Sequence, residues 1–552
     1  MAPRSERDPS VVEVAAVTGG GLLLAVVMTW PLVLRWRTHV VQDEGDPLLQ
    51  AWQVAWGGHA LRTDLASIFQ SNAFWPLPDS LAFSDALLGY APAGLVGAGM
   101  TAASVRHGVL VLLACTLALV GAHLLARELG VRPVPALLAG VVFAWAPWRL
   151  AHLGHLNILS TGGVALTFFL LARGYRLRRW GLVLAGWLVA AWQLSLGLGA
   201  GLFFAYALLV VAGVAGLWWL RAGRPWPGRA VVVATVVGGL VLVGTAGLQA
   251  VPYLRVLDAH PEAVRTVGYL DLYSPPLRGL LAAPSQSWLW GGVTEALRDG
   301  MTWAPEQSRF VGVVAVVAGL GGFVAGRQRR SLRVGLAVAV VVTSVLALGT
   351  MLFGGRFTYL PLYEVLPGWQ GIRTPGRWIT MTTLALGLLA AFGADRLWGS
   401  GAGQRLRRRR VAVVGLVALA VLEGTGRTPI VEVPRPSSAE VFAVPGPRLH
   451  LPSTVTGDQV FMLWTTEEGF PAVVNGASGF VPDALEQVRR DVADFPSAAS
   501  VAALRDLGVR SVVLHPDLAR GTPWEAAAQR SVEGLDVTRR EVGDAVVFDL
   551  GG

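Results

Sequence analysis

The sequence predicts an all-α polytopic membrane bundle followed by a C-terminal α/β domain. Of the 552 residues, 53% are hydrophobic and 15% are charged, and the mean hydropathy is +0.53. Apolar runs recur from Val14 to Thr425, and most have roughly the 17–25 residues that an α-helix needs to cross a bilayer. A membrane β-barrel would instead show short alternating segments. After Gly426 the chain becomes proline-rich and then mixed in character, which indicates a separate soluble domain.

The formal charge of +9 and the pI near 10.4 do not indicate a nucleic-acid partner. The basic residues are all arginine, and many lie in short runs between apolar segments, which is the positive-inside pattern of cytoplasmic loops. These runs are Arg173–Arg179, Arg221–Arg229, Arg327–Arg333 and Arg405–Arg410. The single cysteine, Cys115, excludes an intrachain disulfide and a cysteine-based metal site. The composition is typical of a high-GC bacterium.

Twelve apolar segments are candidate spans. They are 13–35, 86–104, 106–127, 133–149, 156–174, 179–196, 199–221, 230–252, 309–326, 331–353, 377–398 and 410–426. With a cytoplasmic N-terminus, twelve full spans would return the tail to the cytoplasm, whereas the arginine runs place it outside. Either the Gly-, Ala- and Pro-rich segment 86–104 is incomplete, giving eleven spans, or one crossing is missed, giving thirteen.

The first outer loop, 36–85, is expected to contain structure of its own. Asp46-Pro47 is typical of a helix start, with Asp46 as the N-cap. Leu48, Leu49, Trp52, Ala55 and Trp56 then recur at helical spacing, which predicts an amphipathic helix along the membrane interface. A second large outer loop covers 253–308, and the membrane module as a whole covers 1–426.

Acidic residues are concentrated in the first outer loop. Asp43 and Glu44 follow the first span, where a carboxylate would be able to take a proton from an acceptor hydroxyl. The alternative is a hydrated loop that keeps the segment out of lipid. Asp85 precedes the second apolar stretch and either brings a second carboxylate to the same site or caps a helix. Asp43 and Glu44 are the candidate catalytic residues, and Asp46, Asp85, His152 and His155 are candidates for binding the acceptor or a metal, directly or through another ligand.

Two other outer segments carry candidate site residues. His152 and His155, at i and i+3, are suited to hydrogen bonds with a sugar or phosphate, or form a polar turn, since two histidines alone are a weak metal signal. Arg373 and Arg377 precede a span on the side where arginine is disfavoured. Together with Arg149 they are candidates for binding a phosphate, because two N–H groups of a guanidinium can donate to two phosphate oxygens. The alternative is that these arginines contact lipid head groups.

The C-terminal domain is expected to cover 427–552. Strands are predicted at Val460–Trp464, Ser511–Leu514 and Ala545–Leu550, and a capped helix at Ser497–Leu507, closed by Gly508.

Several short motifs resemble uncharacterised bacterial members of the GT-C superfamily of integral-membrane glycosyltransferases. They are Gly45-Asp46-Pro47-Leu48-Leu49, Phe74-Trp75-Pro76, Arg149 to His155, Arg373-Thr374-Pro375-Gly376-Arg377, Asn475-Gly476-Ala477-Ser478-Gly479 and Leu507-Gly508-Val509-Arg510. The resemblance implies transfer of a sugar from a polyprenyl-phosphate donor to a cell-envelope acceptor at the outer face of the bacterial cytoplasmic membrane. It implies that Asp43 is the base and that Arg373 or Arg377 lies near the lipid phosphate. Some members of the superfamily need a divalent cation, Mg or Mn, and others do not.

Two other functions fit the same composition. A transporter or flippase for polyprenyl-linked lipid is less favoured, because the acids lie in a surface loop and no two related halves carry broken, charged helices. A non-catalytic cell-envelope scaffold is the third hypothesis; it would tolerate substitution of the first-loop acids.

Overall fold

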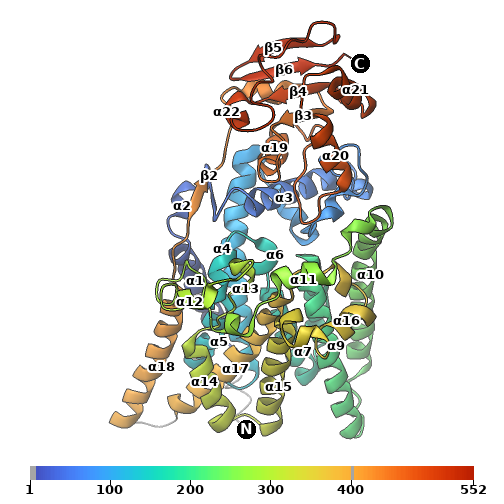
Figure 1. The fold of residues 1–552 in the computed structure, drawn as a ribbon. Helices are drawn as coiled ribbons and strands as arrows, with labels where there is room; N and C mark the ends of the chain where they lie inside the picture. Colours follow the sequence, from blue (N-terminus) through green and yellow to red (C-terminus); the bar gives the residue numbers. More distant parts are fainter. Residues whose placement is uncertain (1–7, 400–402, 552) are drawn as a thin grey trace. The chain divides into compact units, whose positions relative to one another are not determined.

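The computed structural model describes residues 8–399 and 403–551, which form two compact units (Figure 1). Unit 1 contains residues 1–31, 110–248 and 264–428. Unit 2 contains residues 32–109, 249–263 and 429–552, so the first outer loop and the C-terminal tail belong to the same unit.

Unit 1 is a helical bundle. Its helices are α1 (Val11–Met28), α5 (Pro133–Trp145), α6 (Leu156–Leu159), α7 (Gly162–Leu177), α8 (Trp180–Leu194), α9 (Leu198–Arg221), α14 (Val313–Ala325), α15 (Arg330–Ala347), α17 (Ile379–Trp398) and α18 (Gln404–Glu423), together with parts of α4 (Gly99–Glu128) and α10 (Arg229–Ala259). In the described residues, eight helical segments are long and apolar enough to cross a membrane, and α8 and α14 are shorter apolar helices. The chain is therefore a multi-pass membrane protein.

Glycine lets the helices of this bundle approach closely. On α14, a Cβ at Gly322 would lie 1.8 Å from the carbonyl oxygen of Leu389 on α17. A Cβ at Gly393 of α17 would lie 2.4 Å from the carbonyl oxygen of Ala318. No larger residue fits at either position, as expected where small residues mediate helix packing in lipid.

The helices confirm eleven of the twelve expected spans as helical segments, and the exception is 86–104. That segment is a 3₁₀ stretch, η4 (Leu88–Leu95), which contains Pro92, and α4 begins only at Gly99. Leu87, at φ +50°, and Pro92 both disfavour a continuous α-helix, so a span at 86–104 is wrong. The other eleven segments are helical, which agrees with the expectation that segment 86–104 is incomplete.

In unit 2, the first outer loop folds together with the tail. Strand β1 (His39–Val41) pairs antiparallel with β2 (Ile430–Glu432), and β1 leads through residues 42–45 into α3 (Asp46–Thr63). Side chains of the loop and of the tail share one hydrophobic core; examples are Trp52, Phe74, Phe461 and Phe548.

Two expectations for this loop are wrong. Asp46 is the first residue of α3 and not its cap: the N-cap is Gly45, and no side chain caps the helix. Nor is α3 amphipathic, because Leu48 and Trp52 are buried and so are Gln50 and Gln53 on other faces. The helix packs against α19 (Gly457–Trp464) and η4, and a Cβ at Gly58 would meet the backbone of Gly94 at 2.1 Å. It is therefore an interior helix of unit 2.

The tail contributes a four-stranded sheet in the order β3-β4-β6-β5. Strand β3 (Arg448–Leu451) is parallel to β4 (Ser511–Leu514), and β6 (Ala545–Asp549) is antiparallel to both β4 and β5 (Thr538–Val542). The predicted strands β4 and β6 are confirmed, as is the capped helix α21 (Ala498–Asp506), which begins at a Ser497 capping box. Residues 460–464, expected to be a strand, belong to α19. Helix α20 (Asp483–Asp491) and the short α22 (Pro516–Ala519) complete the tail.

Asn475 joins three parts of this tail. Its amide accepts a hydrogen bond from the His450 N–H at 2.6 Å and donates to the His450 carbonyl at 2.8 Å. It also donates to Asp458 Oδ1 at 2.8 Å, and Asp458 is itself buried and paired with Arg489. Beside it, a Cβ at Gly476 would meet the ring of Phe74 at 2.4 Å. The Asn475–Gly479 motif therefore serves packing within unit 2.

Asn475→Ala is expected to lower the free energy of unfolding by about 3 kcal/mol, since it leaves buried partners on His450 and Asp458 unsatisfied. Thermal unfolding of the purified protein measures the change. Ser478→Ala is the matched control, because Ser478 bonds only a local carbonyl, that of Phe480. Equal stability of the two variants would contradict a structural role for Asn475.

Two stacked histidines give the tail a pH-dependent stability. His450 Nδ1 lies 3.0 Å from His515 Nε2, and both rings stack on Phe461. The pKa of His515 is lowered to about 4, mainly by burial; Asp544 opposes this effect and Arg448 adds to it. The contribution of neutral His515 to the stability of the folded protein is therefore complete when the pH is above its pKa in the unfolded state, about 6.5. This contribution is lost as the pH falls toward the pKa of His515 in the folded state.

The protein is expected to be about 2 kcal/mol less stable at pH 5 than at pH 7 on account of His515. Unfolding midpoints of wild type and His515→Gln across this range test the effect. A pH dependence that is unchanged in the variant would show that His515 is not the responsible group.

Candidate active site

Three short segments of unit 1 bring charged side chains together. They are η5 (Pro147–His152), α13 (Ala304–Gln307) and η11 (Pro375–Trp378), which contact one another through α13. One carboxylate oxygen of Glu306 accepts a hydrogen bond from Arg377 Nη2 at 2.8 Å, and the other pairs with Arg309. Arg309 Nη1 donates to His152 Nε2 at 2.9 Å. Because a guanidinium has only donors, His152 accepts at Nε2 and is neutral in this arrangement.

Glu306 stays ionised although it is buried. Burial raises its pKa, but the guanidiniums of Arg377 and Arg309 lower the pKa well below its ordinary value. Glu306 therefore fixes the two guanidiniums in place.

Glu306 and Arg309 were not predicted as site residues. Both fall at the junction of an outer loop and a span, and only the fold shows that they meet His152 and Arg377. The one signal in the sequence is their i, i+3 spacing, which is too common to identify a site.

Arg149 is a second buried cation in the same region. Its side chain is 1% exposed, and its Nη2 donates to Thr161 Oγ1 at 2.9 Å. The Arg149 guanidinium lies 4.8 Å from the centre of the Trp148 ring, and the Arg309 guanidinium lies 5.6 Å from the centre of the same ring. Among residues 8–399 and 403–551, no carboxylate pairs with Arg149. Burying an unpaired cation is costly, which makes Arg149 a candidate for binding an anion.

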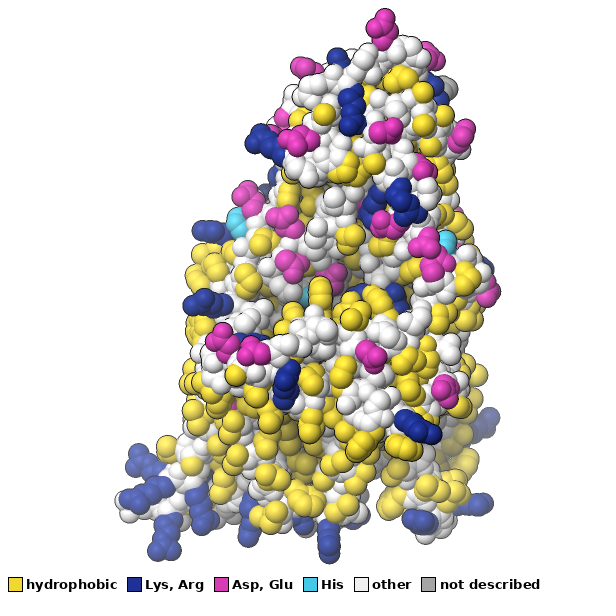
Figure 2. Space-filling view, viewed as in Figure 1, with side chains coloured by type: hydrophobic (Ala, Val, Ile, Leu, Met, Phe, Trp, Pro, Cys, Tyr) yellow, Lys and Arg dark blue, Asp and Glu magenta, His cyan; other side chains and the backbone are white. Residues whose placement is uncertain are grey.

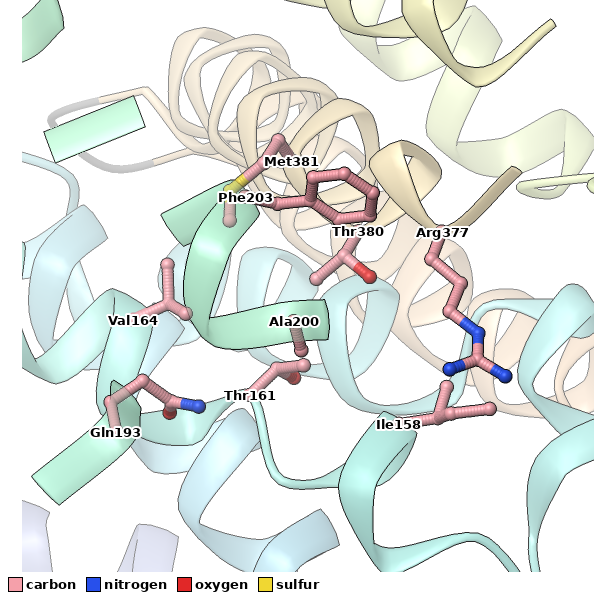
Figure 3. Close-up of a pocket in the computed structure, with 9 residues that line it drawn as sticks. All are labelled: Ile158, Thr161, Val164, Gln193, Ala200, Phe203, Arg377, Thr380 and Met381. Carbon is pink, nitrogen blue, oxygen red and sulfur yellow. The ribbon is translucent and has the colours of Figure 1, made fainter. Parts of the chain in front are cut away.

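A pocket next to this cluster joins Arg377 to an apolar wall (Figure 3). Figure 3 shows the Arg377 guanidinium directed toward Ile158, with Thr161 and Ala200 near the middle of the view. Other lining residues are Val164, Gln193, Ala200, Phe203, Thr380 and Met381. Arg377 is the only charged residue of the lining, and Thr161 links the pocket to Arg149.

The remaining candidates of unit 1 lie around this cluster. The His155 ring is 5.4 Å from that of His152, so the expected common face of the two histidines is present. Arg373 lies over the ring of Tyr273 at 5.4 Å. In the part of the chain that is described, no group of three or more His, Cys, Asp or Glu side chains is arranged to hold a metal ion.

The acidic candidates belong to unit 2. Asp43 is exposed, and its Oδ1 accepts from the Gly45 N–H at 2.8 Å while its Oδ2 accepts from Gln42 Nε2 at 3.2 Å. Gln42 is held in turn by its own N–H, which donates to the Pro429 carbonyl at 2.8 Å. The loop therefore presents a carboxylate of fixed orientation to solvent. Glu44 is also exposed.

Asp85 is not a helix cap, since the N-cap of η4 is Leu87. Its carbonyl accepts from Gln53 Nε2 at 2.9 Å. The Tyr253 hydroxyl donates to the Ser84 carbonyl and accepts from the Ala86 N–H. These bonds fix the backbone on either side of Asp85.

Comparisons with known proteins find no matching protein-family model and no matching curated protein. Solved structures do show likeness. An archaeal oligosaccharyltransferase AglB from Archaeoglobus fulgidus, in complex with an inhibitory peptide and a dolichol-phosphate, is 13% identical over 92% of this chain and 69% of its own, with a TM-score of 0.44. The apo form of the Archaeoglobus fulgidus oligosaccharyltransferase is 12% identical over 93% and 71%, with a TM-score of 0.45. ArnT from Cupriavidus metallidurans, in the apo state, is 15% identical over 97% and 98%, with a TM-score of 0.34. Likenesses of this size do not establish what this chain does.

Proposed function

We propose that the chain is a membrane glycosyltransferase that moves a sugar from a polyprenyl-phosphate donor to an acceptor hydroxyl in the cell envelope. The observation that carries the proposal is the group of arginines Arg149, Arg309 and Arg377, which lies next to the small, largely apolar cavity of Figure 3. A lipid-linked phosphate has both complementary parts, an anion and a hydrocarbon chain. The motifs that resemble the GT-C superfamily point to the same donor.

The charge of the cluster suits the leaving group better than the donor. Arg149, Arg309 and Arg377 carry three positive charges, and Glu306, which pairs with Arg309 and Arg377, carries one negative charge. The net charge is therefore +2 with His152 neutral. A sugar phosphodiester has one negative charge, whereas the departing phosphate monoester has about −1.5 to −2 at neutral pH. The cluster would thus stabilise the transition state more than the ground state, which is what accelerates a reaction.

In this proposal Asp43 is the base. The acceptor hydroxyl gives its proton to an Asp43 carboxylate oxygen, and the acceptor oxygen attacks the anomeric carbon. The bond from that carbon to the phosphate oxygen breaks, and its electron pair leaves with the lipid phosphate. Direct displacement inverts the anomeric centre. The hydrogen bonds from Gly45 and Gln42 support this role because they fix the direction of the carboxylate.

The proposal assigns supporting roles to the other candidates. Arg373 assists Arg377 at the phosphate, and His152 and His155 help to position the sugar or its phosphate, while Glu44, Asp46 and Asp85 contribute on the acceptor side. The resemblance to the superfamily leaves the need for a Mg or Mn ion open, because only some members require one. Because no group of three suitable side chains occurs among the described residues, no step is assigned to a cation. The proposed location is the bacterial cytoplasmic membrane, with the N-terminus inside and the C-terminal tail outside.

Transfer from a panel of radiolabelled polyprenyl-phosphate sugars by the purified protein tests the function. The expected result is transfer from at least one donor, with release of free polyprenyl phosphate. A flippase, reconstituted in liposomes, would move labelled lipid between leaflets without cleaving it, and a scaffold would do neither.

A further inference from the structure

A groove of about 470 Å³ opens between α8 and α10 of unit 1. Trp180 and Leu184 of α8 form one wall, and Val233 and Val237 of α10 form the other, with Arg229 at the end of the groove. The volume lies in the range of roughly 300–1,000 Å³ that is usual for small-molecule pockets. Apart from Arg229, the lining is apolar.

The groove has a closed end and an open end. A Cβ at Gly238 would lie 2.4 Å from the Cβ of Trp187, so α8 and α10 touch there and close the groove just beyond Val237. The opposite end lies at the first residue of each helix, Trp180 and Arg229, and both side chains are exposed. The helices therefore diverge toward their arginine-rich loops. Figures 1 and 2 show the starts of α10, α15 and α18 at the same end of unit 1, where arginine side chains gather.

The arginines at this end differ in their partners. Arg173 and Arg176 of α7 pair with Glu128 and with Asp8. Arg229 and Arg179, which directly precedes Trp180, are exposed, and neither makes an ion pair within the described ranges. The open end of the groove thus presents two positive charges that the protein does not neutralise.

We propose that the groove binds one acyl chain of an anionic glycerophospholipid, whose phosphate lies at Arg229 and Arg179. The apolar lining excludes a peptide, because the polar backbone would be left without partners there. A zwitterionic lipid would place its own cation next to two arginines and bind less well. Basic pockets between membrane helices are known to select anionic head groups, each basic residue strengthening binding measurably. The inference does not depend on the proposed transferase activity.

Native mass spectrometry of the full-length protein in detergent tests the inference, with dioleoylphosphatidylglycerol and dioleoylphosphatidylcholine added in competition. Wild type is expected to retain the anionic lipid preferentially, and Arg229→Gln to reduce the preference about fivefold. Val233→Trp fills the groove and is expected to remove binding of both lipids at this site. A photoreactive acyl chain should crosslink wild type within residues 180–187 and 229–238.

Val243→Trp is the matched control, because Val243 is 69% exposed on the same helix and does not line the groove. It should bind like wild type. Equal retention of the two lipids by wild type, or crosslinks of the Val233→Trp variant within the same two peptides, would overturn the inference. Binding of glycerol 1-phosphate as tight as that of the diacyl lipid would overturn the role of the groove.

Discussion

Arg377→Gln is expected to lower kcat/KM for the lipid-linked donor by at least about 100-fold. The substitution removes the only charge in the lining of the pocket and one of the two cations that hold Glu306. Loss of one partner from a desolvated charge pair costs about 3 kcal/mol, which corresponds to this factor. Binding of polyprenyl phosphate should weaken in the same variant, because the phosphate loses a direct contact. Initial rates and lipid binding measure both effects.

Arg356→Gln is the control for this experiment, since Arg356 is exposed in a loop of the same unit and does not line the pocket. Arg377→Lys separates charge from shape: it keeps the charge but loses the guanidinium fork, and should recover only part of the activity. Wild-type activity and lipid binding in Arg377→Gln would contradict the assignment of the pocket to the donor phosphate.

Asp43→Asn is expected to reduce sugar transfer by about 10²–10⁴-fold, the contribution usual for a general base. Asparagine is nearly the same size, and its carbonyl oxygen still accepts the hydrogen bond from the Gly45 N–H. Its amide nitrogen does not accept from Gln42 Nε2, and the side chain cannot take up the proton. Donor binding should therefore remain at the wild-type level while kcat falls. Parallel measurement of transfer and lipid binding separates the two effects.

Two further substitutions sharpen the assignment. Glu44→Gln tests the neighbouring acid, which is exposed like Asp43 and would carry the effect if the base were there instead. Asp494→Asn changes an exposed carboxylate elsewhere in unit 2 and should leave transfer unchanged. Undiminished transfer by Asp43→Asn would rule out Asp43 as the base.

The long helices were predictable because a membrane span has a strong signal of its own. About twenty apolar residues in succession specify a span whatever its neighbours are. Segment 86–104 had the required composition, but Pro92 and the positive φ of Leu87 break the helix there. The backbone conformations of these two residues therefore decide the structure of the segment, although its average hydropathy is that of a span.

Shorter elements were predicted less well, for physical reasons. The apolar run Val460–Trp464 is compatible with a buried strand or a buried helix, and only the packing of α19 against α3 decides between them. The spacing of Trp52 and Trp56 correctly indicated a helix. Its environment was not predictable, because unit 2 covers α3 on every side with residues that are remote in the sequence.

The site was predictable only in part. Arg149, His152 and Arg377 could be named from their places next to spans, and the structure puts them in one cluster or beside it. Glu306, which organises the cluster, had no distinguishing local pattern. Its role arises from three segments that meet only in the folded chain.

The most direct measurement is a count of sugar transferred and polyprenyl phosphate released in one reaction, by wild type, Asp43→Asn and Arg377→Gln side by side. A glycosyltransferase with the proposed site gives equal amounts of both products in wild type. It gives neither product in Asp43→Asn despite normal lipid binding, and neither product with weakened lipid binding in Arg377→Gln. Binding of the donor by all three proteins without release of polyprenyl phosphate would contradict the account and favour a transporter or a scaffold.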